Sequence, residues 1–162
     1  MELVFDGATP VRVTGSLYTS NWVTAQGDCT RLPGVPVDWP PPQAVDASAE
    51  AKLVLGTTAP PKLVLVKAYR DMDRKSGEPT SDPAATYQCN QFSEPRCAFS
   101  TRVGTTIIDD LPSATTAAPY IAVFCTWFVP PDQQSQGKSP NSNASASWLF
   151  PINITPLSEA EA

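Results

Sequence analysis

Alternating apolar and polar positions predict a chain built from β-strands. In residues 11–18, Val11, Val13 and Leu17 alternate with polar residues, the pattern of a strand with one buried and one wet face. Further runs of β-formers, each bounded by turn residues, predict strands at 51–56, 62–70, 120–129 and 147–155. The run at 97–110 carries Gly104 near its middle, so we expect a bulge or a break between two strands there.

Residues 119–131, PYIAVFCTWFVPP, contain no charge and consist mostly of β-formers. One parity of this run is uniformly apolar and should face a core between two sheets: Ile121, Val123, Cys125, Trp127 and Val129. The other parity, with Tyr120, Phe124 and Phe128, would leave a contiguous apolar patch in water, so something should cover it. The cover is either the proline-rich segment 30–50, which would explain Trp39, or a neighbouring subunit in a homo-oligomer.

Proline content supports the all-β prediction. Eighteen prolines against eight glycines leave almost no proline-free window for a helix longer than two turns. With 162 residues, we expect a single domain with a core at about 8–155 and flanking arms at 1–7 and 156–162. The predicted fold is an antiparallel two-sheet β-sandwich of about seven to nine strands with long proline-rich loops. Pro151 should place its strand at an edge or bend it.

The segment DDLPSATTAAPYIAVFC at 109–125 resembles the immunoglobulin and fibronectin type III sandwich superfamily. In that superfamily a Leu-x-Pro turn precedes a tyrosine at the start of strand F, and Leu111, Pro112 and Tyr120 match this pattern. The gap is about three residues longer than in the fibronectin pattern, and Tyr120 stands five residues before Cys125. The resemblance implies a sandwich fold. The sequence pattern is also similar to that of secreted bacterial sandwich domains, and neither likeness implies a functional residue.

Four cysteines without a CxxC pair or any histidine favour two disulfides over a metal site. Cys89 and Cys97 are close enough in sequence to close a local loop, which leaves Cys29 to pair with Cys125. Disulfides imply an oxidising compartment. The alternative is that all four are buried free thiols.

Charge and composition argue against several functions. A formal net charge of −5 with only 11 Lys and Arg predicts no nucleic-acid partner. No stretch reaches the roughly 18 apolar residues of a membrane span. With no histidine, no Ser-x-x-Lys and no Gly-x-Ser-x-Gly, we expect neither catalysis nor a cofactor.

Two loops carry candidate binding residues. A weak calcium candidate is formed by Asp71, Asp73 and Glu78, but Lys75 occupies the next ligand position, which favours a solvated hairpin turn. The polar loop at 130–145 is the better candidate for a binding site. Its predicted contact residues, with Trp39 as a further candidate, are Asp132, Gln133, Gln134, Lys138 and Asn141.

These patterns predict a non-catalytic domain that acts by binding or adhesion at a cell surface, with a protein or a surface glycan as its partner. The expected localisation is secreted or cell-surface. The alternative is a structural protein of a viral or phage particle, suggested by a chain that begins at Met1 without a signal-peptide pattern.

Overall fold

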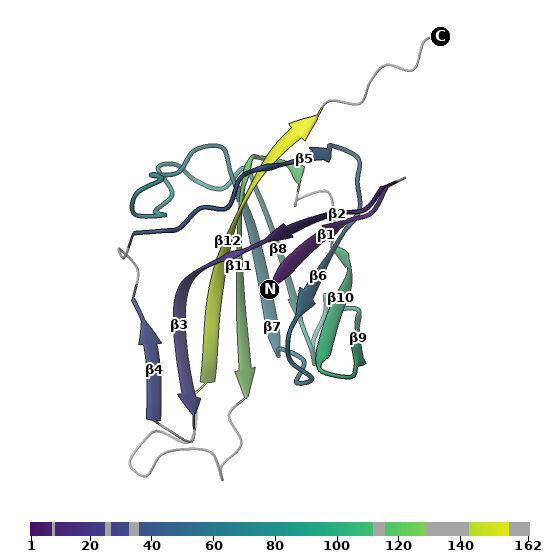
Figure 1. The fold of residues 1–162 in the computed structure, drawn as a ribbon. Helices are drawn as coiled ribbons and strands as arrows, with labels where there is room; N and C mark the ends of the chain where they lie inside the picture. The colour runs from purple at the N-terminus through teal and green to yellow at the C-terminus, as the bar shows by residue number, and fades with distance from the viewer. Residues whose placement is uncertain (8, 25–26, 33–35, 112–115, 129–142, 156–162) are drawn as a thin grey trace.

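The computed structural model describes residues 1–7, 9–24, 27–32, 36–111, 116–128 and 143–155 (Figure 1). Their regular structure is entirely β. The strands are β1 (Glu2–Phe5), β2 (Val11–Thr14), β3 (Ser16–Thr24), β4 (Gly27–Arg31), β5 (Gln43–Asp46), β6 (Ala51–Leu55), β7 (Leu63–Tyr69), β8 (Ala85–Asn90), β9 (Phe99–Arg102), β10 (Thr105–Leu111), β11 (Tyr120–Phe128) and β12 (Asn143–Thr155). The twelve strands exceed the expected seven to nine because two predicted runs each divide into two strands and because four short strands, β1, β4, β5 and β8, were not predicted.

Two sheets pack face to face, which confirms the predicted β-sandwich. The five-stranded sheet has the order β2-β1-β6-β10-β9. The larger sheet has the order β4-β3-β12-β11-β7-β8, and β5 adds a seventh strand beside β12. Every pairing between these strands is antiparallel except that of β5 with β12.

The core lies between the sheets and contains the predicted face of β11. Ile121, Val123 and Cys125 are fully buried, and Trp127 is nearly so. The five-stranded sheet contributes side chains that alternate inward along β1, β6 and β10: Leu3, Phe5, Ala51, Leu53, Leu55 and Ile108. Period-two burial on both sheets is what a sandwich requires, since each strand shows one face to the core.

The predicted strand 11–18 divides at Gly15 into β2 and β3, which belong to different sheets. The chain crosses from one sheet to the other over the ring of Phe150, which is fully buried in the core. A Cβ at Gly15 would lie 2.5 Å from Phe150 Cζ. The absence of a side chain therefore lets the crossing pack directly on the core.

The ends of the chain and the proline-rich segment differ from expectation. Residues 1–7, expected as a flanking arm, contain β1, which pairs with both β2 and β6 and buries Leu3 and Phe5. The expected arm at 156–162 lies outside the described residues. Within the proline-rich segment, residues 43–46 form β5.

Pro151 does not lie on an edge strand, because β12 runs between β3 and β11. On one side of β12 the partner changes at this proline. Pairing with β3 ends at Leu149, and pairing with β5 begins at Ile152. A proline fits such a gap because it cannot donate to a ladder.

The other strand predictions agree with the structure within a few residues. The 97–110 run divides at Gly104, as expected, into β9 and β10. Gly104 has a φ of 72°, in the left-handed region that glycine adopts without strain.

Replacing Gly15 by alanine should destabilise the protein. The new methyl group would overlap the ring of Phe150, which is fully buried in the core, and such overpacking costs about 1–3 kcal/mol. Gly56→Ala is the matched control, since a Cβ there meets nothing within 4 Å. Urea unfolding should show a lower midpoint for Gly15→Ala alone; equal midpoints for the two variants would contradict this packing.

Candidate functional site

The outer face of β11 is covered at its first residue. The Trp39 ring packs edge-on against Tyr120, with 5.6 Å between the ring centroids. A small outer cluster forms around this contact: Tyr69, Met72 and Leu149 are buried in it, with Tyr18, Val37, Trp39, Tyr120 and Ala122 packed around them. Of the two covers considered for this face, the chain's own proline-rich segment is therefore present, and it accounts for Trp39.

Backbone and side-chain hydrogen bonds hold this covering segment, residues 36–42, in place. Trp39 Nε1 donates to the carbonyl of Arg74 at 2.5 Å, and the Val37 N–H donates to the carbonyl of Lys75. The Ser16 hydroxyl donates to the carbonyl of Asp38. The segment is thus fastened to β3 and to the loop at 71–80. A homo-oligomer through Tyr120, Phe124 and Phe128 together would have to displace it.

The loop at 71–80 is a hairpin turn, as favoured over the calcium site. The Asp73 N–H donates to the carbonyl of Glu78, and the Gly77 N–H donates to that of Asp73. The N–H groups of Lys75 and Ser76 donate to the Asp73 carboxylate and hold its pKa below the ordinary value. The Asp73 carboxylate therefore stabilises the turn by accepting hydrogen bonds from its backbone. Among the described residues no group of three or more acidic, Cys or His side chains can hold a metal ion.

The opposite end of β11 lacks such a cover in the described part of the chain, and aromatic rings are exposed there. Thr126 of β11 pairs with Leu63 of β7, which pairs with Asn90 of β8, so β11 and β8 end where β7 begins. Phe128 is 61% exposed and Phe92 65% exposed, and their ring centroids lie 5.7 Å apart. The two rings form an exposed pair at this open end.

A shallow hollow of about 320 Å³ lies beside the Phe92 ring. Its lining combines apolar and hydrogen-bonding groups: Lys62, Leu63, Asn90, Phe92 and Ser93. The Lys62 ammonium lies 4.7 Å from the centre of the Phe128 ring, so Lys62 contacts the ring pair as well as lining the hollow. The hollow thus offers an aromatic ring, an amide, a hydroxyl and a cation within one small area.

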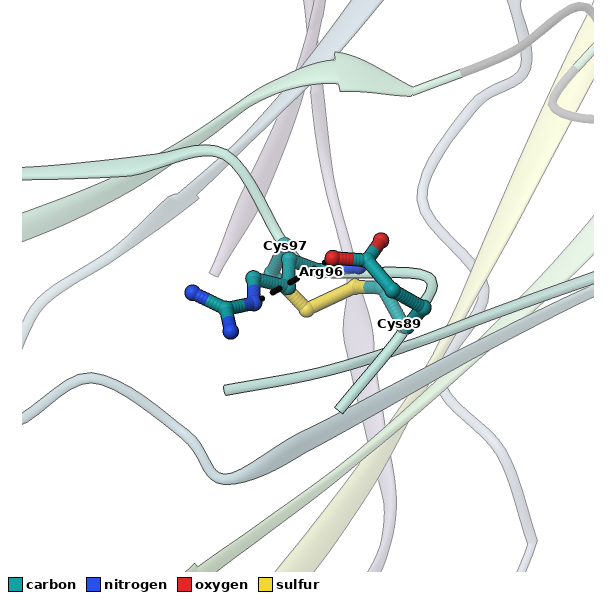
Figure 2. Close-up of a disulfide and its surroundings, with 4 residues drawn as sticks. Cys89, Arg96 and Cys97 are labelled. Carbon is teal, nitrogen blue, oxygen red and sulfur yellow. Dashed lines mark hydrogen bonds and ion pairs between the residues drawn. A yellow bond between two sulfur atoms is a disulfide. The ribbon is translucent and has the colours of Figure 1, made fainter. Parts of the chain in front are cut away.

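The Cys89–Cys97 disulfide fixes the loop that carries Phe92 (Figure 2). This bridge was predicted from spacing, and it is formed. Arg96 makes an ion pair with Glu94 beside it, at 3.3 Å. Two backbone bonds between Asn90 and the far side of the loop, from Asn90 N–H to the Pro95 carbonyl and from Cys97 N–H to the Asn90 carbonyl, close it further. Phe92 is therefore exposed on a constrained loop.

The connection between β6 and β7 brings the five-stranded sheet close to the Phe128 end of β11. Residues 56–62 join β6 to β7; the Thr57 carbonyl accepts from the Thr106 hydroxyl and the Ala59 carbonyl accepts from Trp127 Nε1. The β9–β10 turn at 103–104, next to Thr106, therefore lies at the Phe128 end. The described residues expose five large apolar side chains, and three of them lie at this end of the sandwich: Phe92, Val103 and Phe128.

The predicted bridge between Cys29 and Cys125 is not formed, because Cys125 is a buried free thiol. The backbone of Cys29 lies on β4, and β3 and β12 separate β4 from β11. Three strand spacings amount to about 14 Å, whereas a disulfide needs Cα atoms about 4.4–6.8 Å apart. Burial raises the pKa of the Cys125 thiol far above its ordinary value.

Several predicted site residues lie outside the described residues: Asp132, Gln133, Gln134, Lys138 and Asn141. Sequence reasoning missed Phe92 and Lys62. A signal was available for Phe92, an aromatic residue in an otherwise polar loop between two cysteines. The described residues contain no helix long and apolar enough to cross a membrane.

No protein-family model matches the chain, and neither a curated protein nor a solved structure matches it. The site therefore has to be interpreted from its own chemistry.

Alkylation mapping should separate the buried thiol from the disulfide. In native protein without reductant, iodoacetamide should leave Cys125 unmodified, because the thiol is buried and stays protonated. Denaturant alone should expose Cys125 to labelling, whereas Cys89 and Cys97 should label only after reduction. A disulfide-linked peptide pair containing Cys29 and Cys125 would contradict the structure.

Proposed function

We propose that this chain is a non-catalytic, extracytoplasmic β-sandwich domain that binds a glycan through the open end of the sandwich. The observation that carries the proposal is the exposed Phe92 ring above a hollow lined by an amide, a hydroxyl and an ammonium group. This mixture of groups favours a surface glycan over a protein as the partner.

A sugar ring presents apolar C–H groups on its faces and hydroxyls around its rim. The C–H groups pack on an aromatic ring, and the hydroxyls need donors and acceptors beside that ring. Asn90 supplies both a donor and an acceptor, and Ser93 supplies a hydroxyl. Lys62 adds a donor and a positive charge, which favours acidic sugars over neutral ones.

We further infer that the sandwich is of the immunoglobulin and fibronectin type III kind. Strand order supports this inference: β1-β6-β10-β9 follows the A-B-E-D sheet of that fold, and β12-β11-β7-β8 follows its other sheet with one added strand. Tyr120 stands at the start of β11, the counterpart of strand F. By this correspondence β2 to β5 are an insertion between the first two strands of the fold.

The same correspondence supports the position of the binding end. In immunoglobulin variable domains the loops between strands B and C and between F and G lie at the antigen-binding end. Their counterparts here are the connections at 56–62 and 129–142, and the first of them leads to Lys62. This is a likeness of fold, and the chemistry of the hollow remains the main support.

Localisation and lack of catalysis belong to the same proposal. The Cys89–Cys97 disulfide supports an oxidising compartment, hence a secreted or cell-surface position. The chain contains no histidine to act as a proton shuttle, which supports binding without turnover. A viral or phage structural role stays a prediction from the sequence alone.

Native affinity electrophoresis in gels containing soluble polysaccharides tests this function. A panel of neutral and uronic-acid polymers should include at least one that retards the wild-type protein. Phe92→Ala should bind that polymer about tenfold more weakly, corresponding to about 1.4 kcal/mol, because the sugar loses its stacking partner.

Leu32→Ala is the matched control, since it also removes an exposed apolar side chain, 67% exposed, beyond β4 at the other edge of the sheet. It should be retarded like the wild type. The proposal fails if no polymer retards the protein, or if Phe92→Ala and Leu32→Ala behave alike.

A further inference from the structure

A second pocket, of about 100 Å³, lies at the opposite end of β11 from the aromatic hollow. It forms where β12 leaves β3 and begins to pair with β5. Its walls include a proline from each of three neighbouring segments: Pro42, Pro119 and Pro151. A ligand there would not touch Phe92, so binding in this pocket is independent of the proposed glycan site.

The three prolines in the walls offer this pocket no backbone N–H donor. Proline has no N–H to donate, and the Pro119 carbonyl already accepts from the Ile152 N–H at 2.8 Å. The remaining polar groups come from Arg74, Tyr120 and Asn153. Arg74 and Asn153 are exposed, and Tyr120 is half-buried, so the pocket opens to solvent.

Arg74 contacts Trp39 through both its backbone and its side chain. Its guanidinium lies 5.8 Å from the centre of the Trp39 ring, and its carbonyl accepts from the Trp39 indole N–H. Trp39 in turn packs edge-on against Tyr120. A guanidinium that lies over an aromatic ring loses less rotational freedom on binding than a fully solvated one, so the arrangement favours ligand capture.

The charge of Arg74 has no acidic partner within the described ranges. Their three ion pairs use Arg12, Lys52 and Arg96 instead. In a chain of net charge −5, an unpaired guanidinium at the mouth of a pocket favours an anionic ligand.

We propose that this pocket binds a carboxylate. The guanidinium fork of Arg74 pairs with the two carboxylate oxygens, and the Asn153 amide and the Tyr120 hydroxyl donate to the lone pairs that remain. The pocket is well below the roughly 300–1,000 Å³ of ordinary small-molecule sites, so it accepts one functional group of a larger ligand. A single cation matches the single charge of a carboxylate better than the nearly double charge of a phosphate monoester.

A carboxylate that could enter this pocket as one group of a larger ligand has two sources, the C-terminus of a peptide and the uronic acid of a glycan. N-Acetylglycine represents the first and glucuronate the second. N-Acetylglycinamide is the neutral match for N-acetylglycine, and methyl phosphate tests the preference for a carboxylate over a phosphate.

The indole N–H of Trp39 is a built-in reporter, because it donates to the residue that should hold the ligand. In ¹⁵N-labelled protein its cross-peak is assigned by its loss in Trp39→Phe. At least one of the two carboxylates should shift this peak saturably, and N-acetylglycinamide should not. The carboxylate that binds with the lower Kd identifies whether the ligand is a peptide C-terminus or a uronic acid.

Arg74→Gln should weaken carboxylate binding at least tenfold, while Arg102→Gln, an exposed arginine at the other end of the sandwich, should leave it unchanged. The other indole peaks report whether each variant remains folded. The proposal is overturned if neither carboxylate shifts the peak, if the amide shifts it equally, if methyl phosphate binds more tightly, or if Arg74→Gln titrates like the wild type.

Discussion

The apolar composition of β11 on both faces is the constraint on which the rest of this structure depends. Its inner face, with Ile121, Val123 and Cys125, packs into the core between the sheets. Its outer face is nearly as apolar, and Trp39 covers only the end at Tyr120. The uneven cover gives the two ends of one strand different chemistry, with a small proline-walled pocket at one end and exposed rings at the other.

The covering segment is stable because several weak contacts act together. Trp39 and Val37 each bond to the backbone of the 71–80 turn, and that turn is itself closed by the Asp73 carboxylate. A Cβ at Gly77 would lie 2.6 Å from Val37 Cγ2, so the turn and the segment are in close contact. These contacts together fasten residues 36–42 to the turn, and the turn supplies Arg74 to the pocket.

The positions of most strands could be predicted from the local sequence pattern. The pairing of strands and of cysteines that lie far apart in the sequence could not. Period-two burial is a property of a few neighbouring residues, so β6, β7, β10 and β11 were predictable. β5 contains Gln43 and Asp46 in a proline-rich stretch, and only its pairing with β12 makes it a strand. The sequence around Cys125 carries no local sign of whether this cysteine has a disulfide partner. Its separation from β4 depends on β3 and β12 intervening, which is a property of the whole sheet.

The candidate sites show the same division. The proline-rich segment with Trp39 was one of two covers that the sequence allowed, because a lone tryptophan among prolines is a local signal, and Tyr120 was recognised as apolar surface that needs covering. Lys62 and Phe92 lie on separate connections, one before β7 and one after β8, and the register of that pair brings them together. Arg74 becomes a site residue only through its contact with Trp39, 35 residues earlier in the chain.

Hydrogen–deuterium exchange of the wild type and Trp39→Ala tests most directly whether Trp39 divides β11 into a covered and an open end. Removing the ring should speed amide exchange in residues 36–42, in the 71–80 turn and at the start of β11, because these segments depend on the Trp39 contacts. Exchange at residues 88–92 and at the Phe128 end should stay as in the wild type. Equal acceleration at both ends of β11, or no change at the Tyr120 end, would contradict this division of the strand.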